Sequence, residues 1–230
     1  MSDSALQRMT DLALREQLRN VYWIGGASAA GKSTIARRVA AEHGLRVYAT
    51  DDVMADHARR SSREDSPSLH EFIAMDMDER WLHRSPQEMF ETFHWFRGEC
   101  FNSIVEDLLR MDHERGGTLD ALPQSVIVDG FRLLPHLVAP LLTSRNHAVW
   151  LLPTPDFRRA VVESRGGSSW SFLAKTSDPE RALHKLLERD RMFTDMLREE
   201  TARLHLHAIE VDTTTTEDDL VQRVTELFGL

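Results

Sequence analysis

The feature that most constrains this chain is a glycine-rich loop set between an apolar run and a helical pattern. Apolar residues 21–24 lead into two glycines, then small residues, then Gly-Lys-Ser-Thr, which gives the spacing G-x-x-x-x-G-K-S from Gly26. Glycines let a backbone turn tightly and bring N–H groups toward an anion. A helix that starts directly after the loop adds the positive end of its dipole. The pattern therefore predicts a phosphate-binding loop.

The residue types inside the loop predict the ligand more closely. Lys32 has the reach for the β- and γ-phosphates of a nucleotide, and the hydroxyl of Ser33 is suited to Mg²⁺. We therefore expect a nucleoside triphosphate, ATP, with Mg²⁺. The alternative is a glycine turn followed by a surface lysine. The residues expected to hold the nucleotide are Gly26, Ala27, Ser28, Ala29, Ala30, Gly31, Lys32, Ser33 and Thr34.

Length and charge limit the other classes of function. The chain has 230 residues and a net charge of −9, which disfavours a general nucleic-acid binder. No run approaches the roughly 18 apolar residues of a membrane helix. The single cysteine, Cys100, excludes an internal disulfide and fits a reducing compartment, so we expect a cytoplasmic protein.

Short apolar runs alternate with helical patterns along the chain. This alternation predicts an α/β fold with a five-stranded parallel sheet and helices on both faces, a three-layer α/β/α domain over residues 1–230. The expected strands are 21–24, 46–49, 125–128, 148–152 and 208–211. The expected helices are 31–43, 86–111, 133–142, 156–163, 179–204 and 217–228.

Two segments interrupt this alternation. Residues 56–85 are polar and long for a connection, so we expect them to form a small helical cap. We expect residues 56–100 to bind the acceptor, the second substrate that would receive a phosphate from the nucleotide. Residues 165–178 combine glycines and serines with a lone tryptophan, which is typical of a mobile lid. Each segment has a plain alternative as a variable surface loop.

Acidic residues follow two of the predicted strands. Ligands of open parallel sheets bind beyond the carboxyl ends of the strands, so Asp51 and Asp52 are expected near the γ-phosphate if the second strand neighbours the first. Either carboxylate can act as general base toward an acceptor hydroxyl, and the alternative role is a helix cap. Asp129 is followed by Gly130 and not by a water-activating glutamate, and no Asn-Lys-x-Asp occurs. Both facts disfavour a motor ATPase and a GTPase.

Four stretches in order resemble the P-loop small-molecule kinases. They are GGASAAGKST (25–34, the Walker A loop), YATDDVM (48–54), VIVDGFRLLP (126–135) and DPERALHKLLERDRMF (178–193), and they span most of the chain. The chain looks most like the chloramphenicol phosphotransferase, zeta-toxin, gluconate kinase and adenylate kinase groups. The resemblance implies transfer of the γ-phosphate of ATP to an alcohol, with Asp51 or Asp52 on the acceptor hydroxyl.

The same resemblance suggests roles for further residues. It implies that Asp129 acts with Ser33 on the Mg²⁺ side or contacts the substrate, unless it serves as a helix cap or a buried hydrogen-bonding group. It also implies that arginines in and around the lid stabilise the transferred phosphoryl group. Arg189 and Arg191 are two positions apart on a helix, so both cannot face the phosphate equally. The main candidates are Arg165, Arg189 and Arg191, with Arg158, Arg159, Arg181 and Lys175 behind them.

The sequence says least about the acceptor, the molecule that would receive the phosphate. His94 and Arg97 interrupt an apolar helical pattern and are candidates for the acceptor pocket, although a polar surface face explains them as well. A pocket of mixed charge suits a hydroxylated molecule that is sugar-like, nucleoside-like or antibiotic-like. The alternatives are a nucleotide or nucleoside kinase, and a non-catalytic ATP-binding regulator.

Overall fold

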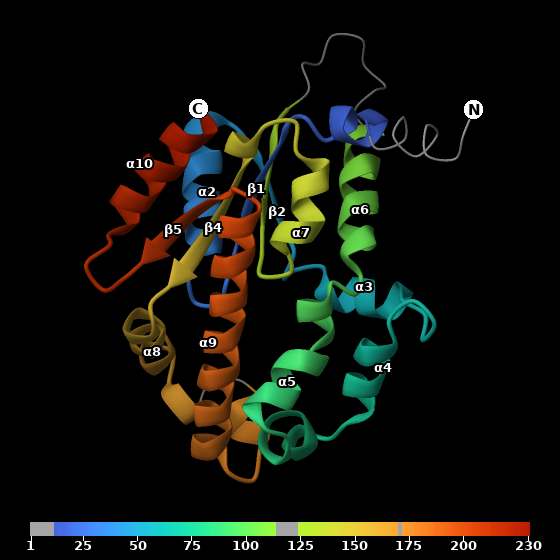
Figure 1. Ribbon diagram of the computed structural model, residues 1–230, viewed down its shortest axis with the longest axis vertical. Coiled ribbons are helices and arrows are strands. Elements are labelled where there is room, and N and C mark those ends of the chain that lie inside the picture. The colour runs from blue at the N-terminus through green and yellow to red at the C-terminus, as the bar shows by residue number, and fades with distance from the viewer. Residues whose placement is uncertain (1–11, 114–123, 170–171) are drawn as a thin grey trace.

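The computed structural model describes residues 12–113, 124–169 and 172–230. Its centre is an all-parallel sheet of five strands in the order β2-β3-β1-β4-β5, flanked by helices on both faces (Figure 1). The predicted α/β class and the three-layer arrangement are therefore confirmed. The strands are β1 (Val21–Gly26), β2 (Arg46–Ala49), β3 (Val126–Asp129), β4 (Ala148–Pro153) and β5 (His207–Val211).

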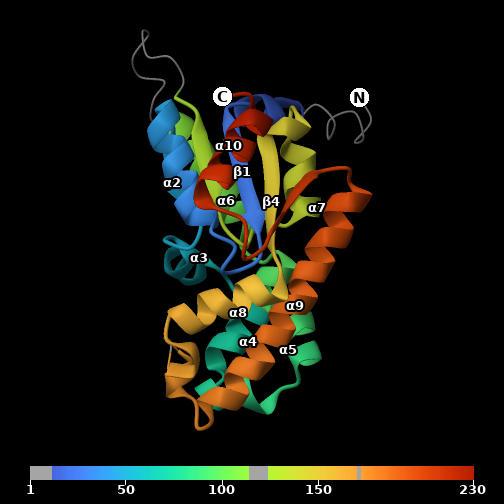
Figure 2. The ribbon, with the colours of Figure 1, turned by 90° about the vertical axis from the view of Figure 1, so that its left-hand side faces the viewer.

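Alternating side chains of the strands supply two separate apolar layers. In β1, Ile24 packs in the layer formed with α2 (Lys32–His43) and α10 (Glu217–Phe228). Its neighbour Trp23 packs in the other layer. Figure 2 shows α2 and α10 on one side of β1 and β4, with α7 and α9 on the other. The helices of that second face are α6 (Phe101–His113), α7 (Pro135–Val138) and α9 (Pro179–Arg203).

The register of the strands brings their carboxyl ends to one edge. Asp129 at the end of β3 lies level with Ile24 of β1 and with Ala49 of β2. The chain therefore leaves the sheet at this same edge after β1, β2 and β3. β3 lies between β1 and β2, so the second strand does not neighbour the first. The condition that we attached to the position of Asp51 and Asp52 is thus not met, although the shared edge remains.

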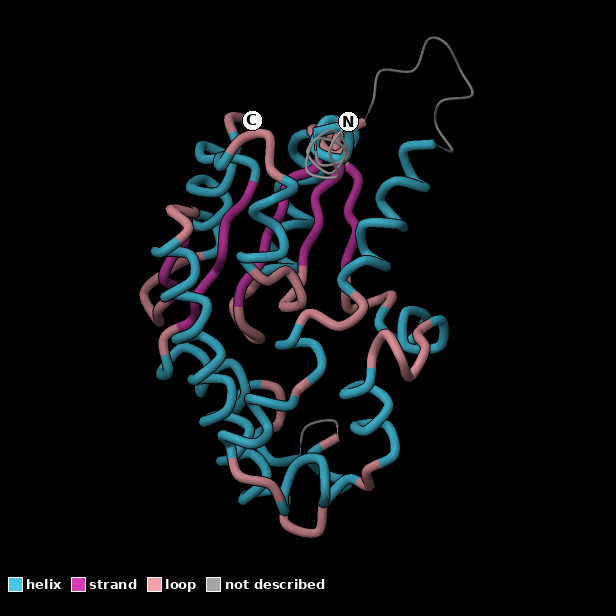
Figure 3. Tube along the Cα trace, turned by 45° about the vertical axis from the view of Figure 1, so that its right-hand side comes forward, coloured by secondary structure: helices cyan, strands magenta, loops and turns pink. Residues whose placement is uncertain are grey.

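Beyond this edge lies a helical layer that covers the ends of the strands (Figures 1 and 3). The expected helical character of residues 56–85 is confirmed, and we call residues 54–97 the cap. The elements of this layer are α3 (Met54–Arg60), α4 (Pro67–Ala74), a π-helical turn Glu79–His83, α5 (Pro86–Thr92) and α8 (Pro155–Ser164), together with one half of α9.

The predicted continuous helix over residues 86–111 is wrong. The chain leaves α5 at Phe93, makes a 3-10 turn His94–Arg97 and restarts as α6 at Phe101. Gly98 has a φ of 80°, a left-handed conformation that an α-helix cannot contain. A Cβ atom there would also lie 2.7 Å from Leu137 Cδ1. The glycine ends the helical path and lets α7 pack closely.

The other predicted helices agree to within a few residues, except that 133–142 is only α7 followed by a 3-10 turn, Ala139–Leu141. Pro135 begins α7, and a second proline lies inside the 3-10 turn. The expected lid contains two short 3-10 turns, Gly167–Ser169 and Leu173–Lys175, while residues 170 and 171 lie outside the described residues. In the part of the chain that is described, no helix has the length and apolar character to cross a membrane.

Candidate active site

The glycine-rich loop, residues 26–34, is shaped by backbone conformations that few residues adopt. Gly26, Ala29 and Gly31 have φ values of 126°, 65° and 81°. Gly26 also passes so close to β4 that a Cβ atom would lie 2.1 Å from the carbonyl oxygen of Leu151. Ala29 is strained, because a left-handed conformation disfavours any side chain, and such strain is concentrated at functional sites.

The start of α2 has no side chain covering its free N–H groups. Its N-cap is Gly31, which makes no side-chain cap, and its first turn contains no acidic residue. Side-chain caps close α5, α8, α9 and α10 at Ser85, Thr154, Asp178 and Thr216, whereas the short helices α3, α4 and α7 lack one, as α2 does. Uncapped N–H groups at a helix start carry partial positive charge and favour an anion.

Lys32 belongs to this loop, and it is buried, with only 7% of the residue exposed. Its ammonium donates a 2.7 Å hydrogen bond to the carbonyl oxygen of Ala27. Burial lowers the pKa of Lys32 to about 8, partly opposed by the negative charges of Asp51 and Asp129. The ammonium is therefore held by a loop carbonyl with two carboxylates in electrostatic range, which keeps it charged at neutral pH.

Ser33 and Asp129 form the polar end of the site at β3. The hydroxyl of Ser33 donates to Asp129 Oδ1 at 2.9 Å, while Asp129 Oδ2 is buried without a partner. Burial raises the pKa of Asp129, and the Ser33 hydrogen bond and Lys32 oppose that rise. A hydroxyl beside an unsatisfied carboxylate oxygen fits the oxygen ligands of Mg²⁺, which keeps most of its shell as water and phosphate. Among the described residues, no group of three or more His, Cys, Asp or Glu is placed so that it could hold a metal ion.

Asp51 and Asp52 follow β2, and both side chains are exposed. Partial desolvation raises the pKa of Asp51, against the opposing charges of Lys32 and Arg132. Asp51 is also the strongest negative charge acting on Lys32. Asp51 therefore lies in electrostatic contact with the loop and is the better placed of the two carboxylates.

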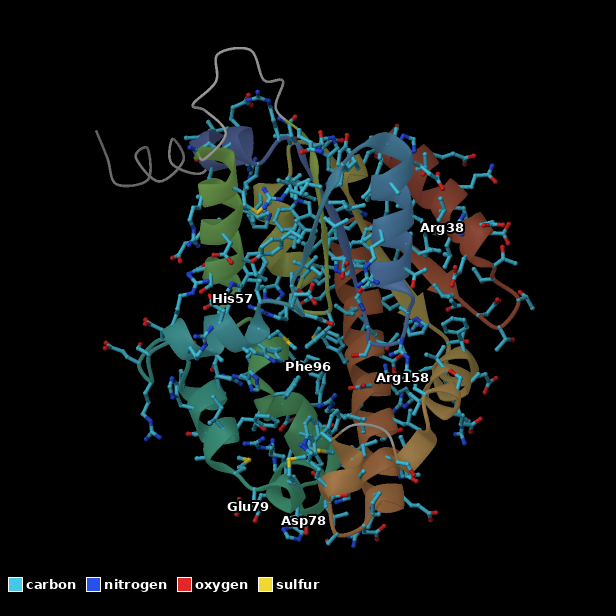
Figure 4. The ribbon with its side chains drawn as sticks, turned by 180° about the vertical axis from the view of Figure 1, so that it is seen from behind. Arg38, His57, Asp78, Glu79, Phe96 and Arg158 are labelled. Carbon is cyan, nitrogen blue, oxygen red and sulfur yellow. The ribbon has the colours of Figure 1, made fainter. Side chains whose placement is uncertain are left out.

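A buried ion triad joins the loop to the helices α8 and α9. Arg158 donates to the carbonyl oxygen of Ser28 at 2.8 Å and to Asp190 Oδ2. Arg189 donates twice to the other oxygen of Asp190, at 2.8 and 2.5 Å. Figure 4 shows Arg158 on α8, near the level at which the strands end. One carboxylate thus holds two arginines, of which Arg158 contacts the loop.

The other predicted arginines separate into two environments. The charge of Arg165 lowers the pKa of both Lys32 and Arg158, so the start of the lid lies near the loop. Arg191 is exposed and pairs with Glu188 and Asp195 along α9. The structure therefore brings Arg165 toward the loop and leaves Arg191 on the surface.

The two predicted acceptor residues point to different places because the 3-10 turn replaces the expected helix. His94 is 2% exposed among the rings of Phe72, Phe93 and Trp95, and its Nδ1 has no partner. Arg97 is exposed and donates to the carbonyl oxygen of Glu91. His94 therefore lies inside the cap, whereas Arg97 does not join it there.

Sequence reasoning missed a buried residue of this region, Arg132, which follows β3. It donates to the carbonyl oxygens of Thr50 and Cys100 and to Nδ1 of His57. Because arginine only donates, His57 Nδ1 accepts, and its Nε2–H donates to Asp107 at 2.8 Å. Nothing in the pattern of "DGFRLL" distinguishes this arginine from a surface residue. Asp190 was missed for a similar reason, since it lies between two arginines on a charged helix.

Comparisons with known proteins do not assign a family. No protein-family model matches the chain, and no curated protein matches it. An uncharacterized protein from Eubacterium ventriosum has a similar structure, with a TM-score of 0.45 and 15% sequence identity. The match covers 91% of this chain and 97% of the other.

Proposed function

We propose that this protein is a P-loop kinase that transfers the γ-phosphate of ATP to a hydroxyl group of a small molecule. The observation that carries the proposal is the convergence of three parts at one sheet edge. These are the uncapped glycine-rich loop with buried Lys32, the Ser33–Asp129 pair, and Asp51 in electrostatic range of Lys32. A sheet edge with an anion-binding loop, a metal-suited oxygen pair and a nearby carboxylate supports phosphoryl transfer.

The loop supplies the binding of the donor. Lys32 and Arg158 now donate to the carbonyl oxygens of Ala27 and Ser28, and a phosphate oxygen is a stronger acceptor for either cation. Ser33 and Asp129 would hold Mg²⁺, which neutralises charge on the β- and γ-phosphates. Arg158 stabilises charge that develops on the transferred group, because a fixed cation in a buried site needs little reorganisation. Arg165 is exposed and adds positive charge from the start of the lid.

Asp51 takes the role of the general base. A carboxylate whose pKa is raised by partial desolvation is a stronger base than an ordinary aspartate. It accepts the proton of the acceptor hydroxyl as that oxygen attacks the γ-phosphorus. The bond from this phosphorus to the β–γ bridging oxygen breaks, ADP leaves, and Lys32 and Arg158 offset the negative charge that develops on it. The Asp52→Asn variant is the matched control for Asp51→Asn, since Asp52 follows Asp51 directly in the chain.

The test separates binding from transfer. Lys32→Ala is expected to lose Mg·ATP binding in calorimetry, whereas Asp51→Asn keeps binding and loses about 10²- to 10⁴-fold in ADP formation with alcohol acceptors. Asp52→Asn is expected to lose much less. Unchanged ATP binding by Lys32→Ala would refute the proposal at its first step, and undiminished transfer by Asp51→Asn would refute the role of the base.

A further inference from the structure

Buried positive charge exceeds buried negative charge where the sheet meets the cap. Among the residues that the structure describes, the buried cations of this region are Lys32, Arg132, Arg158 and Arg189, against the buried carboxylates of Asp129 and Asp190. Burying a charge without a counterion is strongly unfavourable, so an excess of this kind points to an anionic ligand. ATP accounts for the two cations that contact the loop, Lys32 and Arg158. It does not account for Arg132 and Arg189.

Arg189 lies on the cap side of the ion triad. Its guanidinium stands 4.6 Å from the ring of Phe93, 5.1 Å from Phe96 and 5.2 Å from Trp81. These rings belong to the cap. The Nη1 atom has no hydrogen-bond partner, although the residue is only 5% exposed. Asp190 is shared with Arg158, so a single carboxylate faces two guanidinium groups.

Arg132 approaches the cap from the end of β3 in a comparable way. It stacks 4.3 Å above Trp95 and is 2% exposed. Its Nε is buried and unpartnered, and its other nitrogens donate to two carbonyl oxygens and to neutral His57. Burial lowers the pKa of Arg132, against more distant opposing charges that include Asp51 and Asp107. The guanidinium is therefore fixed in position while one donor remains unused.

His94 connects the two arginines. Burial, followed by the charges of Arg132 and Arg189, lowers the pKa of His94 to about 3. Both arginines therefore act on the same imidazole, which stays neutral, and its Nδ1 is also unpartnered. Buried polar groups without partners are uncommon in folded proteins and call for an explanation. Here three of them, on Arg132, Arg189 and His94, belong to one cluster.

We propose that Arg132 and Arg189 bind an anionic group of the acceptor, either a carboxylate or a phosphate monoester. The proposal rests on the proposed function only in calling this ligand the acceptor. Arginine is suited to both groups because its planar donors match paired oxygens, and the cap rings hold the guanidinium groups flat. A neutral sugar or alcohol would leave both unused donors and the excess charge in place.

Access to the pair requires the cap and the lid to separate, because both arginines are almost fully buried. At the outer end of the cap, Asp78 accepts a 2.7 Å hydrogen bond from the backbone N–H of Ser177 (Figure 4). Lys185 of α9 donates to the carbonyl oxygens of Leu82 and Arg84, at 2.7 Å each. These contacts lie at the partly exposed margin, so opening there leaves the sheet intact.

The test uses inorganic anions as probes of the intact protein. Orthophosphate or acetate is titrated in the millimolar range with the loop filled by Mg·AMP-PNP, and the fluorescence of the tryptophans is followed, since Trp81 and Trp95 contact the pair. We expect a saturable change with at least one of the two anions and none with chloride at equal ionic strength. The anion that responds more strongly distinguishes a phosphate from a carboxylate.

Variants locate the response. Arg189→Gln is expected to weaken it at least tenfold, and Arg198→Gln, an exposed arginine on the same helix, is expected to leave it unchanged. Arg132→Lys is the second variant if Arg189→Gln fails to fold. The absence of a saturable response in the natural chain overturns the proposal, and so does an equal response in the arginine variants of the cluster.

A titration of the Lys32→Ala variant with orthophosphate, in the absence of nucleotide, distinguishes this proposal from the kinase proposal. If orthophosphate still changes the fluorescence of Lys32→Ala, the anion binds outside the loop, whether or not the natural chain binds ATP. If Lys32→Ala abolishes the response, orthophosphate binds in the loop, and the cap proposal falls while the kinase proposal stands.

Discussion

The hydroxyl of Ser33 donates a 2.9 Å hydrogen bond to Asp129 Oδ1, across 96 positions of the sequence. This contact joins the glycine-rich loop to the end of β3, and it leaves the second oxygen of Asp129 buried without a partner. The pair is therefore already assembled, and one carboxylate oxygen is free to take part in a metal shell.

The first prediction concerns this pair. Ser33→Ala and Asp129→Asn are each expected to raise the Mg²⁺ concentration needed for half-maximal ATP turnover by about 10- to 100-fold, because each removes an oxygen that orients the metal shell. A Mg²⁺ titration of ADP formation measures this. Ser164→Ala, which removes a hydroxyl bonded only to its own helix, is the matched control. An unchanged Mg²⁺ requirement in both site variants would exclude the metal role.

The second prediction concerns the pH dependence of ATP binding. The pKa of Lys32 is about 8 in the free protein, and bound phosphate is expected to raise it. ATP affinity should therefore be constant below about pH 8 and fall by up to about tenfold for each pH unit above it. Calorimetry at several pH values measures the effect. Lys32→Arg keeps its charge, so its affinity, although lower, should not decline in that range.

The third prediction concerns acid stability. His94 has a pKa of about 3 in the folded chain, and an unfolded histidine has a pKa of about 6.5. Between these values only the unfolded chain binds the proton, so the free energy of unfolding falls as the pH falls. From pH 7 to pH 5 this loss is about 2 kcal/mol.

The His94→Gln variant should lack this contribution, so its free energy of unfolding should decline about 2 kcal/mol less over the same interval. Urea unfolding at both pH values measures the difference. His184→Gln on the exposed face of α9 is the control, and it should decline as the natural chain does. Equal declines in His94→Gln and the natural chain would mean that His94 is not buried in the neutral form.

The fourth prediction concerns the close approach of Gly26 to β4, measured as the free energy of unfolding in urea. Gly26→Ala is expected to reduce the free energy of unfolding by about 3 kcal/mol, because the new methyl group meets the Leu151 carbonyl and the φ of 126° is strained. Gly44→Ala has a positive φ of 67° but open space around it, so it should lose only about 1 kcal/mol. Equal losses would show that β4 yields to the added methyl group.

Much of the fold could be predicted from the sequence because its signals are local. Each strand is a short apolar run bounded by polar residues, and the start of α2 follows from the glycine pattern. The order of the strands could not be predicted, since β3 inserts between β1 and β2 through contacts distant in sequence. The prediction of a continuous helix over 86–111 was wrong because the apolar spacing continues through Gly98. The left-handed conformation of Gly98 depends on packing against α7.

The candidate site divides in the same way. Lys32, Ser33 and Asp129 belong to a local motif or to a strand end, so the sequence indicates them. Arg132 and Asp190 become notable only through burial, because each resembles an ordinary surface charge until the tertiary contacts form. The sequence therefore describes the glycine-rich loop side of the candidate site better than the cap side.

The most direct test of the proposed kinase activity is to follow where the γ-phosphate of ATP goes. The chain is incubated with Mg²⁺, γ-labelled ATP and a panel of carboxylate-bearing, phosphate-bearing and neutral alcohols, and the labelled products are separated. We expect label in a phosphate ester of one acceptor class, with little in inorganic phosphate, and loss of that ester in Asp51→Asn. Label that passes only to water, at the same rate with and without every acceptor, would contradict it.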